Sequence, residues 1–157
     1  MTRFSATKRS SAVVAHDRAA VWAVLVDPSQ VARLTPMVRS IEADGDVWHW
    51  RLAPIELLGR SVGLSLTERM EFTPQERIRY THVPGAERAG VDGTYTLADA
   101  RAGGQDGTRL GIVVEVHVDL PFPSLARPAV QASMHAVLAS MGAGFAHQLE
   151  RHLRSTH

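Results

Sequence analysis

The 157-residue sequence predicts an α+β fold, in which a curved antiparallel sheet of about seven strands wraps around a long C-terminal helix, with two short helices after the first strand. Apolar and polar residues alternate with period two from residue 37 to 120. Apolar residues recur at helical spacing on both sides of that region, near residues 17–34 and after residue 124. No helical pattern separates the strands, as parallel pairing would require, so we expect antiparallel strands with one apolar and one polar face.

The first part of the chain contains one strand and two helices. Residues 3–15 alternate weakly and predict an edge or near-edge strand. Asp17 can cap a helix that continues to Val26. Pro28 can begin a second short helix at its first position, and that helix is expected to end near Leu34.

The alternating region predicts six further strands. They are expected at residues 37–43, 47–52, 62–72, 77–83, 90–98 and 108–120. Asp44-Gly45-Asp46 is typical of a tight turn, whereas residues 53–59 are expected to be a loop and residues 103–107 a flexible hairpin connection.

The last predicted element is a helix from Ser124, its candidate N-cap, to about Arg154. About thirty helical residues span ~45 Å, so this helix needs a long partner surface, which the apolar face of the sheet can supply. Gly142 and Gly144 interrupt its apolar stripe. They either let a strand or a ligand come close, or mark a bend.

Composition excludes several classes of function. Seventeen basic and 16 acidic residues give a net charge of +1 with no basic stripe, so we expect no nucleic-acid partner. The absence of cysteine excludes disulfides and thiolate chemistry. Neither an apolar signal region nor a membrane-spanning stretch is present, which favours a cytoplasmic protein, as a monomer or homodimer.

We expect no metal and no cofactor. His147 and His152 are five residues apart and do not share a helix face. The sequence has no HExxH, no GxGxxG, no P-loop and no nucleophile elbow.

Residues 14–28, VAHDRAAVWAVLVDP, resemble the first strand end and opening helix of the START-like (SRPBCC) superfamily, which includes pollen allergens, lipid-transfer domains and bacterial polyketide cyclases. Asp17 stands where that family commonly has proline, and Ala19 where it commonly has an acid. The order of elements extends the resemblance over nearly the whole chain. It implies a helix-grip fold, one START-like ligand-binding domain over residues 1–157, and an internal cavity, but no particular chemistry.

In such a fold, one helix cannot fill the hollow of a bent sheet, so we expect a cavity between them. The candidate ligand-binding residues lie on the apolar faces of the strands and the last helix. They are Trp50, Leu66, Met70, Tyr80, Tyr95, Ile112, Val114, Met134, Val137 and Met141.

Glu68 and His82 are the candidate catalytic residues, because both fall on apolar strand faces. A buried carboxylate without a partner is costly. Three alternatives therefore follow for Glu68: it pairs with His82 or a tyrosine, a β-bulge turns it outward, or it meets a ligand.

Two functions remain open. The first is binding of a small hydrophobic ligand, such as a lipid, an isoprenoid or a polyketide-like aromatic, which predicts an almost wholly apolar lining. The second is a polyketide cyclase or aromatase, which predicts a polar cluster inside the cavity. A protein-interaction module is a weaker third reading, and it predicts an exposed apolar patch outside the cavity.

Overall fold

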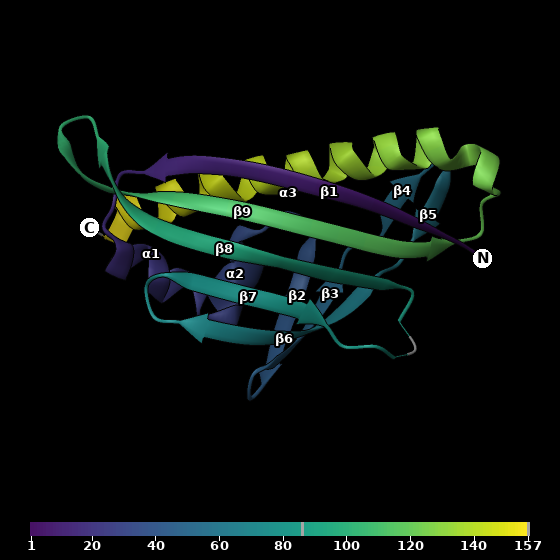
Figure 1. Ribbon diagram of the computed structural model, residues 1–157, viewed down its shortest axis with the longest axis horizontal. Helices are drawn as coiled ribbons and strands as arrows, with labels where there is room; N and C mark the ends of the chain where they lie inside the picture. The colour runs from purple at the N-terminus through teal and green to yellow at the C-terminus, as the bar shows by residue number, and fades with distance from the viewer. Residues whose placement is uncertain (86, 157) are drawn as a thin grey trace.

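The computed structural model describes residues 1–85 and 87–156. Figure 1 shows the elements in chain order. They are β1 (Thr2–Val14), α1 (Arg18–Leu25), α2 (Pro28–Leu34), β2 (Val38–Asp44), β3 (Val47–Leu52), β4 (Ile55–Leu57), β5 (Arg60–Val62), β6 (Ser65–Thr73), β7 (Arg77–His82), β8 (Ala89–Ala102), β9 (Gln105–Leu120), the 3-10 turn η1 (Ser124–Ala126) and α3 (Arg127–Thr156).

Seven strands form one antiparallel sheet in the order β1-β9-β8-β7-β6-β3-β2. α3 runs along this sheet beside β1, and α1 and α2 lie near the C-terminal end of α3 (Figure 1). The predicted fold class, with a curved sheet, a long C-terminal helix and two short helices after the first strand, is therefore confirmed.

Local capping explains both short helices. Asp17 accepts a hydrogen bond from the Ala20 backbone N–H at 2.9 Å. Asp27 accepts from the backbone N–H groups of Ser29 and Gln30 at 3.1 and 3.4 Å. These carboxylates satisfy donors that have no partner within the first helical turn, so each helix begins where the sequence predicts it.

The prediction of a loop over residues 53–59 was wrong. β4 and β5 form a separate two-stranded hairpin, and Ile55, Leu57 and Val62 are buried in it. Three-residue strands are too short to show a period of two. Val62 therefore belongs to the hairpin, and the strand expected from residue 62 begins at Ser65.

The flexible connection expected at residues 103–107 is a tight turn instead. The β8–β9 ladder continues to the Ala102–Gln105 pair. Gly103 and Gly104 have φ angles of 58° and 86°, which two-residue hairpin turns require and which glycine adopts without strain. Both strands are therefore longer than their apolar alternation indicates.

Ser124 does not cap the long helix. It begins the 3-10 turn η1, which has no side-chain cap, and α3 starts at Arg127. Gly144 shows why the apolar stripe of α3 is interrupted. A Cβ there would lie 2.3 Å from Cγ of Pro36, so this glycine lets the segment after α2 approach the helix.

Two apolar clusters form the core, one toward each end of α3. The first surrounds α1, α2 and the C-terminal part of α3, with Val21, Leu25 and Leu149 almost fully buried. The second surrounds the β4–β5 hairpin and the start of α3, with Phe4 and Val130 fully buried. The middle of α3 lies between these two clusters.

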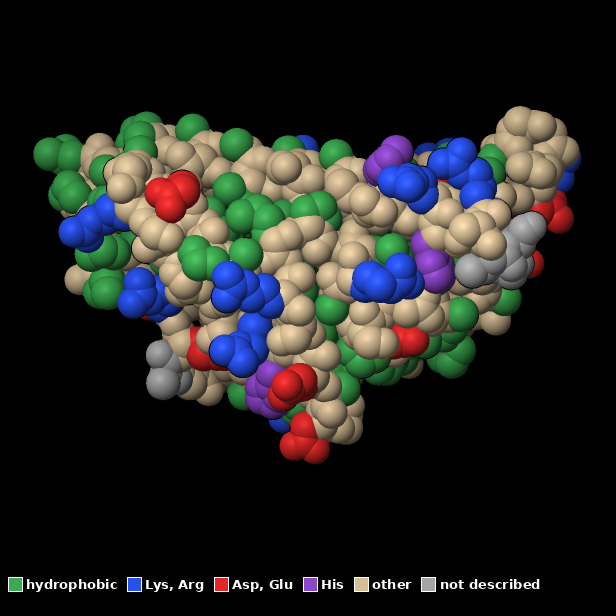
Figure 2. All heavy atoms as spheres, turned by 180° about the vertical axis from the view of Figure 1, so that it is seen from behind, with side chains coloured by type: hydrophobic (Ala, Val, Ile, Leu, Met, Phe, Trp, Pro, Cys, Tyr) green, Lys and Arg blue, Asp and Glu red, His purple; other side chains and the backbone are tan. Residues whose placement is uncertain are grey.

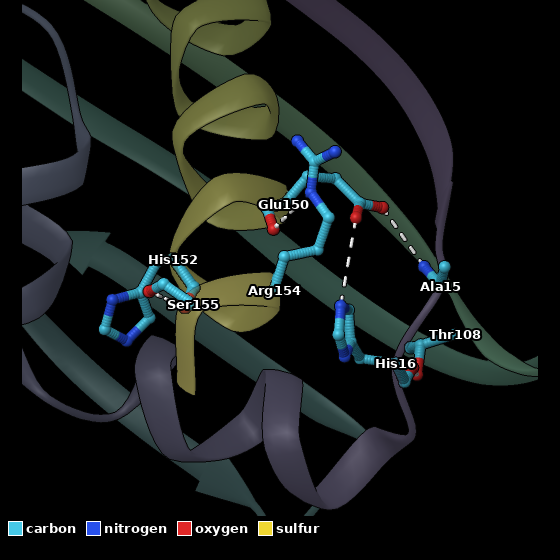
Figure 3. A network of polar contacts seen from close by, with 7 residues as sticks. All are labelled: Ala15, His16, Thr108, Glu150, His152, Arg154 and Ser155. Atoms are coloured by element: carbon cyan, nitrogen blue, oxygen red, sulfur yellow. Dashed lines mark hydrogen bonds and ion pairs between the residues drawn. The ribbon is translucent and has the colours of Figure 1, made fainter. Parts of the chain in front are cut away.

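Polar contacts fix the C-terminal end of α3 to the β1–α1 connection (Figure 3). Glu150 accepts a hydrogen bond from the Ala15 backbone N–H at 3.1 Å, and its other oxygen lies 4.0 Å from His16 Nε2. Thr108 donates to the His16 carbonyl at 2.8 Å. The helix is therefore tied to the sheet at this end by polar as well as apolar groups.

On the face of the molecule in Figure 2, Lys and Arg side chains are scattered and do not form one stripe.

Across residues 1–85 and 87–156, no helix has both the length and the apolar character needed to cross a membrane.

Candidate ligand-binding cavity

A cavity of about 470 Å³ lies between the sheet and α3. β1, β3, β6, β7, β8, β9 and α3 contribute to its wall, together with residues of the β4–β5 hairpin and the two short helices. The wall is mainly aliphatic and aromatic. The terminal helix therefore covers the hollow of the sheet without filling it.

The structure places all ten candidate ligand-binding residues on this wall. These are Trp50, Leu66, Met70, Tyr80, Tyr95, Ile112, Val114, Met134, Val137 and Met141. Their position is a property of the structure, whereas their role in binding is a proposal. Of the two candidate catalytic residues, Glu68 lies on the wall and His82 does not.

Several wall residues were missed from the sequence. Val91 and Val116 share the strand faces of Tyr95 and Val114, so strand alternation alone could have identified them. Phe145 belongs to the same helix stripe as Met141. Ser10 has no comparable signal, because β1 is polar over most of its second half.

The opening of the cavity lies between β1 and the middle of α3. Ser10, Ser11 and Ala12 line the cavity and are also exposed, as are Ala139 and Ala143 of α3. Small side chains on both elements leave space between them. Gly142 contributes further, because a Cβ added there would meet no atom within 4 Å.

Glu68 places a buried carboxyl on the cavity wall. It projects from β6 with 3% exposure, and Trp48 and His82 are its neighbours across the adjacent strands. Within the described part of the chain, no group hydrogen-bonds to its carboxyl. Burial, reinforced by the negative charge of Asp92, raises the pKa of Glu68 to about 8, so the carboxyl is mainly protonated at neutral pH.

These observations exclude two of the three alternatives for Glu68. It is not turned outward, and in residues 1–85 and 87–156 it pairs with neither His82 nor a tyrosine. Its carboxyl is therefore available to a molecule in the cavity.

Two tyrosines lie near Glu68 in the cavity. The rings of Tyr80 and Tyr95 are 5.2 Å apart between centroids and inclined at 55°. The Tyr80 hydroxyl donates to the Val113 carbonyl at 3.3 Å. Burial raises the pKa of both phenols, and the charge of Glu68 adds to this effect, so both hydroxyls stay protonated.

Trp50 presents a second polar group without a partner. Its Nε1 is buried and has no hydrogen-bond acceptor within the described residues. A buried donor without a partner costs about 1–3 kcal/mol. Trp50 pairs with Leu66 and Glu68 with Trp48, so Trp50 and Glu68 are diagonal neighbours on the same face of β3 and β6.

His82 interacts with a different set of groups. Its Nδ1 lies 2.9 Å from both carboxylate oxygens of Asp92, and its ring packs edge-on against His117 with centroids 4.7 Å apart. Burial lowers the pKa of His117, and the positive charges of Arg3 and of His82 lower it further. None of these three clustered residues lines the cavity.

The chain resembles several solved structures over nearly its full length. A conserved protein from Geobacillus kaustophilus is 15% identical, with 97% of each chain covered and a TM-score of 0.70. A START superfamily protein from Mycobacterium smegmatis is 15% identical, with 96% of this chain and 99% of that chain covered and a TM-score of 0.68. The Zhui aromatase/cyclase from a Streptomyces species is 16% identical, with 96% and 94% covered and a TM-score of 0.66. At these identities the likeness establishes the fold alone.

None of the curated proteins compared with the chain matches it. The family model described as polyketide cyclase/dehydrase and lipid transport matches residues 1–152. This match covers both short helices, the whole sheet and most of α3. The chain therefore belongs to the polyketide cyclase/dehydrase and lipid transport family.

Proposed function

We propose that the chain binds a small, mostly apolar molecule in the cavity, with a hydrogen-bonding group of that molecule held at Glu68. The observation that carries this proposal is the buried, unpartnered Glu68 carboxyl on an otherwise largely apolar wall. A volume of about 470 Å³ falls in the range of small-molecule sites.

The polar groups indicate what the ligand carries. Protonated Glu68 and Trp50 Nε1 are both donors, and the Tyr95 hydroxyl has no protein partner in the described part of the chain. Donors on a neutral wall suit a carbonyl or hydroxyl oxygen. Fatty acids, isoprenoid alcohols and polyketide-like aromatics all combine such an oxygen with a large apolar surface.

Burial of the apolar part supplies most of the affinity. Removing roughly 300 Å² of ligand surface from water contributes about 7 kcal/mol before the costs of association. A micromolar Kd corresponds to about 8 kcal/mol. One or two hydrogen bonds to groups without a protein partner therefore decide whether the Kd reaches the micromolar range.

Binding of 2-naphthol and naphthalene tests this proposal. The two probes share one ring system and differ by a hydroxyl, so equilibrium dialysis should give 2-naphthol an affinity about fivefold to tenfold higher. Glu68→Met should remove most of this difference. Equal affinities of both probes for the wild-type protein would contradict a polar end of the site.

A variant that blocks the cavity tests where the two probes bind. Gly142 is four residues after Leu138 and three before Phe145, so it lies on the inner face of α3. Gly142→Leu should abolish the binding of both probes, whereas Ser140→Leu, on the exposed side of the same helix, should not. Unchanged binding by Gly142→Leu would place the probes elsewhere.

A cyclase or dehydratase is the second candidate function. It is favoured by one observation: a carboxyl with a pKa of about 8 can donate or accept a proton near neutral pH. An enzyme of this kind would hold a flexible polyketide chain in the cavity and use Glu68 as its acid or base.

Turnover of a poly-β-ketone thioester would test this second candidate. The rate should depend on a group titrating near pH 8, and Glu68→Gln should lower kcat by about 100-fold or more. Tight binding of the thioester without turnover at any pH would leave the binding function and exclude the enzyme.

A further inference from the structure

Three adjacent strands bring His82, Asp92 and His117 together on the other side of the sheet from the cavity. Val91 of β8, and Val116 and Val118 of β9, line the cavity. Since successive side chains of a strand point to opposite faces, Asp92 and His117 face away from it. His82 is the last residue of β7, just beyond the Tyr80–Gly93 pair where the β7–β8 ladder ends.

A glycine makes this approach possible. Gly90 is the ladder partner of His117, and a Cβ at Gly90 would lie 2.3 Å from Cε1 and 2.6 Å from Nε2 of His117. The same Cβ would lie 3.0 Å from Cβ of His82. The His117 imidazole therefore occupies the space of the missing side chain and crosses β8 toward His82.

The three side chains lie near enough for side-chain movements of up to about 1.5 Å to bring their ligand atoms around one metal ion. One ligand atom from each residue lies within 4.8 Å of the other two. Zinc binds imidazole nitrogen and carboxylate oxygen at about 2.0–2.2 Å, so ligand atoms in a tetrahedral site are about 3.3 Å apart. His82 Nδ1 and the Asp92 carboxylate, at 2.9 Å, need to separate by a few tenths of an ångström.

The surroundings hold these ligands in place. Asp92 Oδ1 also accepts a hydrogen bond from the His82 backbone N–H at 2.9 Å, which orients the carboxylate. The side chains of His82 and Asp92 are 35% and 36% exposed, so the site is accessible from solvent. The nearby cation Arg3 is engaged by Asp119 at 3.1 Å, which reduces its repulsion of a second positive charge.

We propose that His82, Asp92 and His117 bind a divalent transition-metal ion, with water completing its coordination. Two imidazoles and one carboxylate are ligands that Zn²⁺ and its neighbours in the first transition series accept, and three protein ligands leave a coordination position open. The site is separate from the cavity and does not depend on the function proposed for the cavity.

The sequence prediction of no metal site rested on the absence of a local ligand motif and on the expected position of His16, His49 and His117 on polar strand faces or in loops. His82, Asp92 and His117 lie ten and 25 residues apart along the chain, and the pairing of β7, β8 and β9 brings them together. A long-range ligand set of this kind leaves no motif in the sequence.

Calorimetric titration of the untagged, chelator-treated protein with ZnCl₂ tests the proposal. We expect one Zn²⁺ per chain, and a loss of affinity of about 100-fold or more in His117→Ala and in Asp92→Asn. His135→Ala, which removes an exposed histidine of α3, is the matched control and should bind as the wild type does. Circular dichroism of each variant establishes that the fold is retained.

Cobalt supplies an independent readout, because Co²⁺ in a site of four or five ligands absorbs visible light far more strongly than aqueous Co²⁺. Wild type and His135→Ala should give this spectrum, and His117→Ala should not. The absence of Zn²⁺ binding by the wild type would overturn the proposal. Binding that survives in both His117→Ala and Asp92→Asn would overturn it as well.

Discussion

Two groups of ionisable side chains on neighbouring strands illustrate opposite ways of handling polarity in one sheet. On the inner face, Glu68 is buried, unpartnered within the described residues and mainly protonated at neutral pH. On the other side of the sheet, His82 of β7 and Asp92 of β8 are partly exposed and hydrogen-bonded to each other. Glu68 has no protein partner among the described residues, so a ligand can provide one. His82 and Asp92 already hydrogen-bond to each other.

The comparison is sharper because Glu68 and His82 are ladder partners. A regular pair would place both side chains on one face, and an ion pair between them would be the simplest arrangement. His82 instead turns to Asp92. Among the described residues, Glu68 is thereby left without a hydrogen-bond partner, and the negative charge of Asp92, which pairs with His82, raises the pKa of Glu68 further.

The largest predicted effect concerns pH and stability. Glu68 has a folded pKa of about 8 and an ordinary unfolded pKa near 4.5. Between these values the folded state holds a proton that the unfolded state has lost, so the free energy of unfolding falls as pH rises from about 4.5 to 8. The loss attributable to Glu68 should be on the order of a few kcal/mol.

Urea unfolding of wild type and Glu68→Gln at several pH values measures this loss as the difference between the two proteins. The difference should favour Glu68→Gln increasingly toward pH 8 and level off above it. Glu115→Gln, an exposed carboxyl on β9, is the matched control and should track the wild type. A constant difference between wild type and Glu68→Gln across pH 5–9 would show that Glu68 has an ordinary pKa.

A smaller effect is predicted for Gly90→Ala. The new methyl group would meet His117 and the Cβ of His82, and we expect a loss of about 1–3 kcal/mol from overpacking. Because His117 must move, the substitution should also abolish Zn²⁺ binding. A variant as stable as wild type that still binds Zn²⁺ would show that Gly90 does not position the ring.

For Gly142→Ala we predict a gain in stability instead of a loss. A Cβ there meets nothing within 4 Å, and alanine is favoured over glycine in a helix by about 1 kcal/mol. Thermal unfolding should therefore show a raised Tm. Gly90→Ala therefore measures how tightly His82 and His117 pack against β8. Gly142→Ala measures how much free space remains beside α3 at the cavity.

The smallest predicted effect links Asp92 on the outer face of the sheet to Glu68 in the cavity. Asp92→Asn removes a negative charge that raises the pKa of Glu68, so Glu68 should titrate at a lower pH in this variant. A carbon-13 NMR titration of the Glu68 carboxyl would measure the change. An unchanged midpoint would show that burial alone accounts for the raised pKa.

The sequence was sufficient for the fold where elements are long and periodic. The alternation in β9 and the apolar stripe of α3 extend over several pairs or turns, and most of each element lies where predicted. The β4–β5 hairpin was missed because strands of three residues carry no period. The extension of β8 and β9 was missed because their ends are polar and pair through the backbone.

The residues of the candidate site were likewise predictable where they belong to long, periodic elements. Wall residues such as Met70 and Met141 were found because a cavity between sheet and helix is lined by the apolar faces that define both elements. The choice among the alternatives for Glu68 needed coordinates, because it depends on which way His82 turns. The cluster of His82, Asp92 and His117 depends on the strand register, on the missing side chain of Gly90 and on the orientation of His82.

The most direct test of the central claim uses the five methionines as reporters. Met70, Met134 and Met141 line the cavity, whereas Met1 is 81% exposed and lies outside it. With carbon-13-labelled methionine methyl groups and saturating 2-naphthol, NMR should show ligand-to-methyl nuclear Overhauser effects at those three residues and none at Met1. Effects at Met1 alone, or at no methionine, would contradict binding inside the hollow beneath α3.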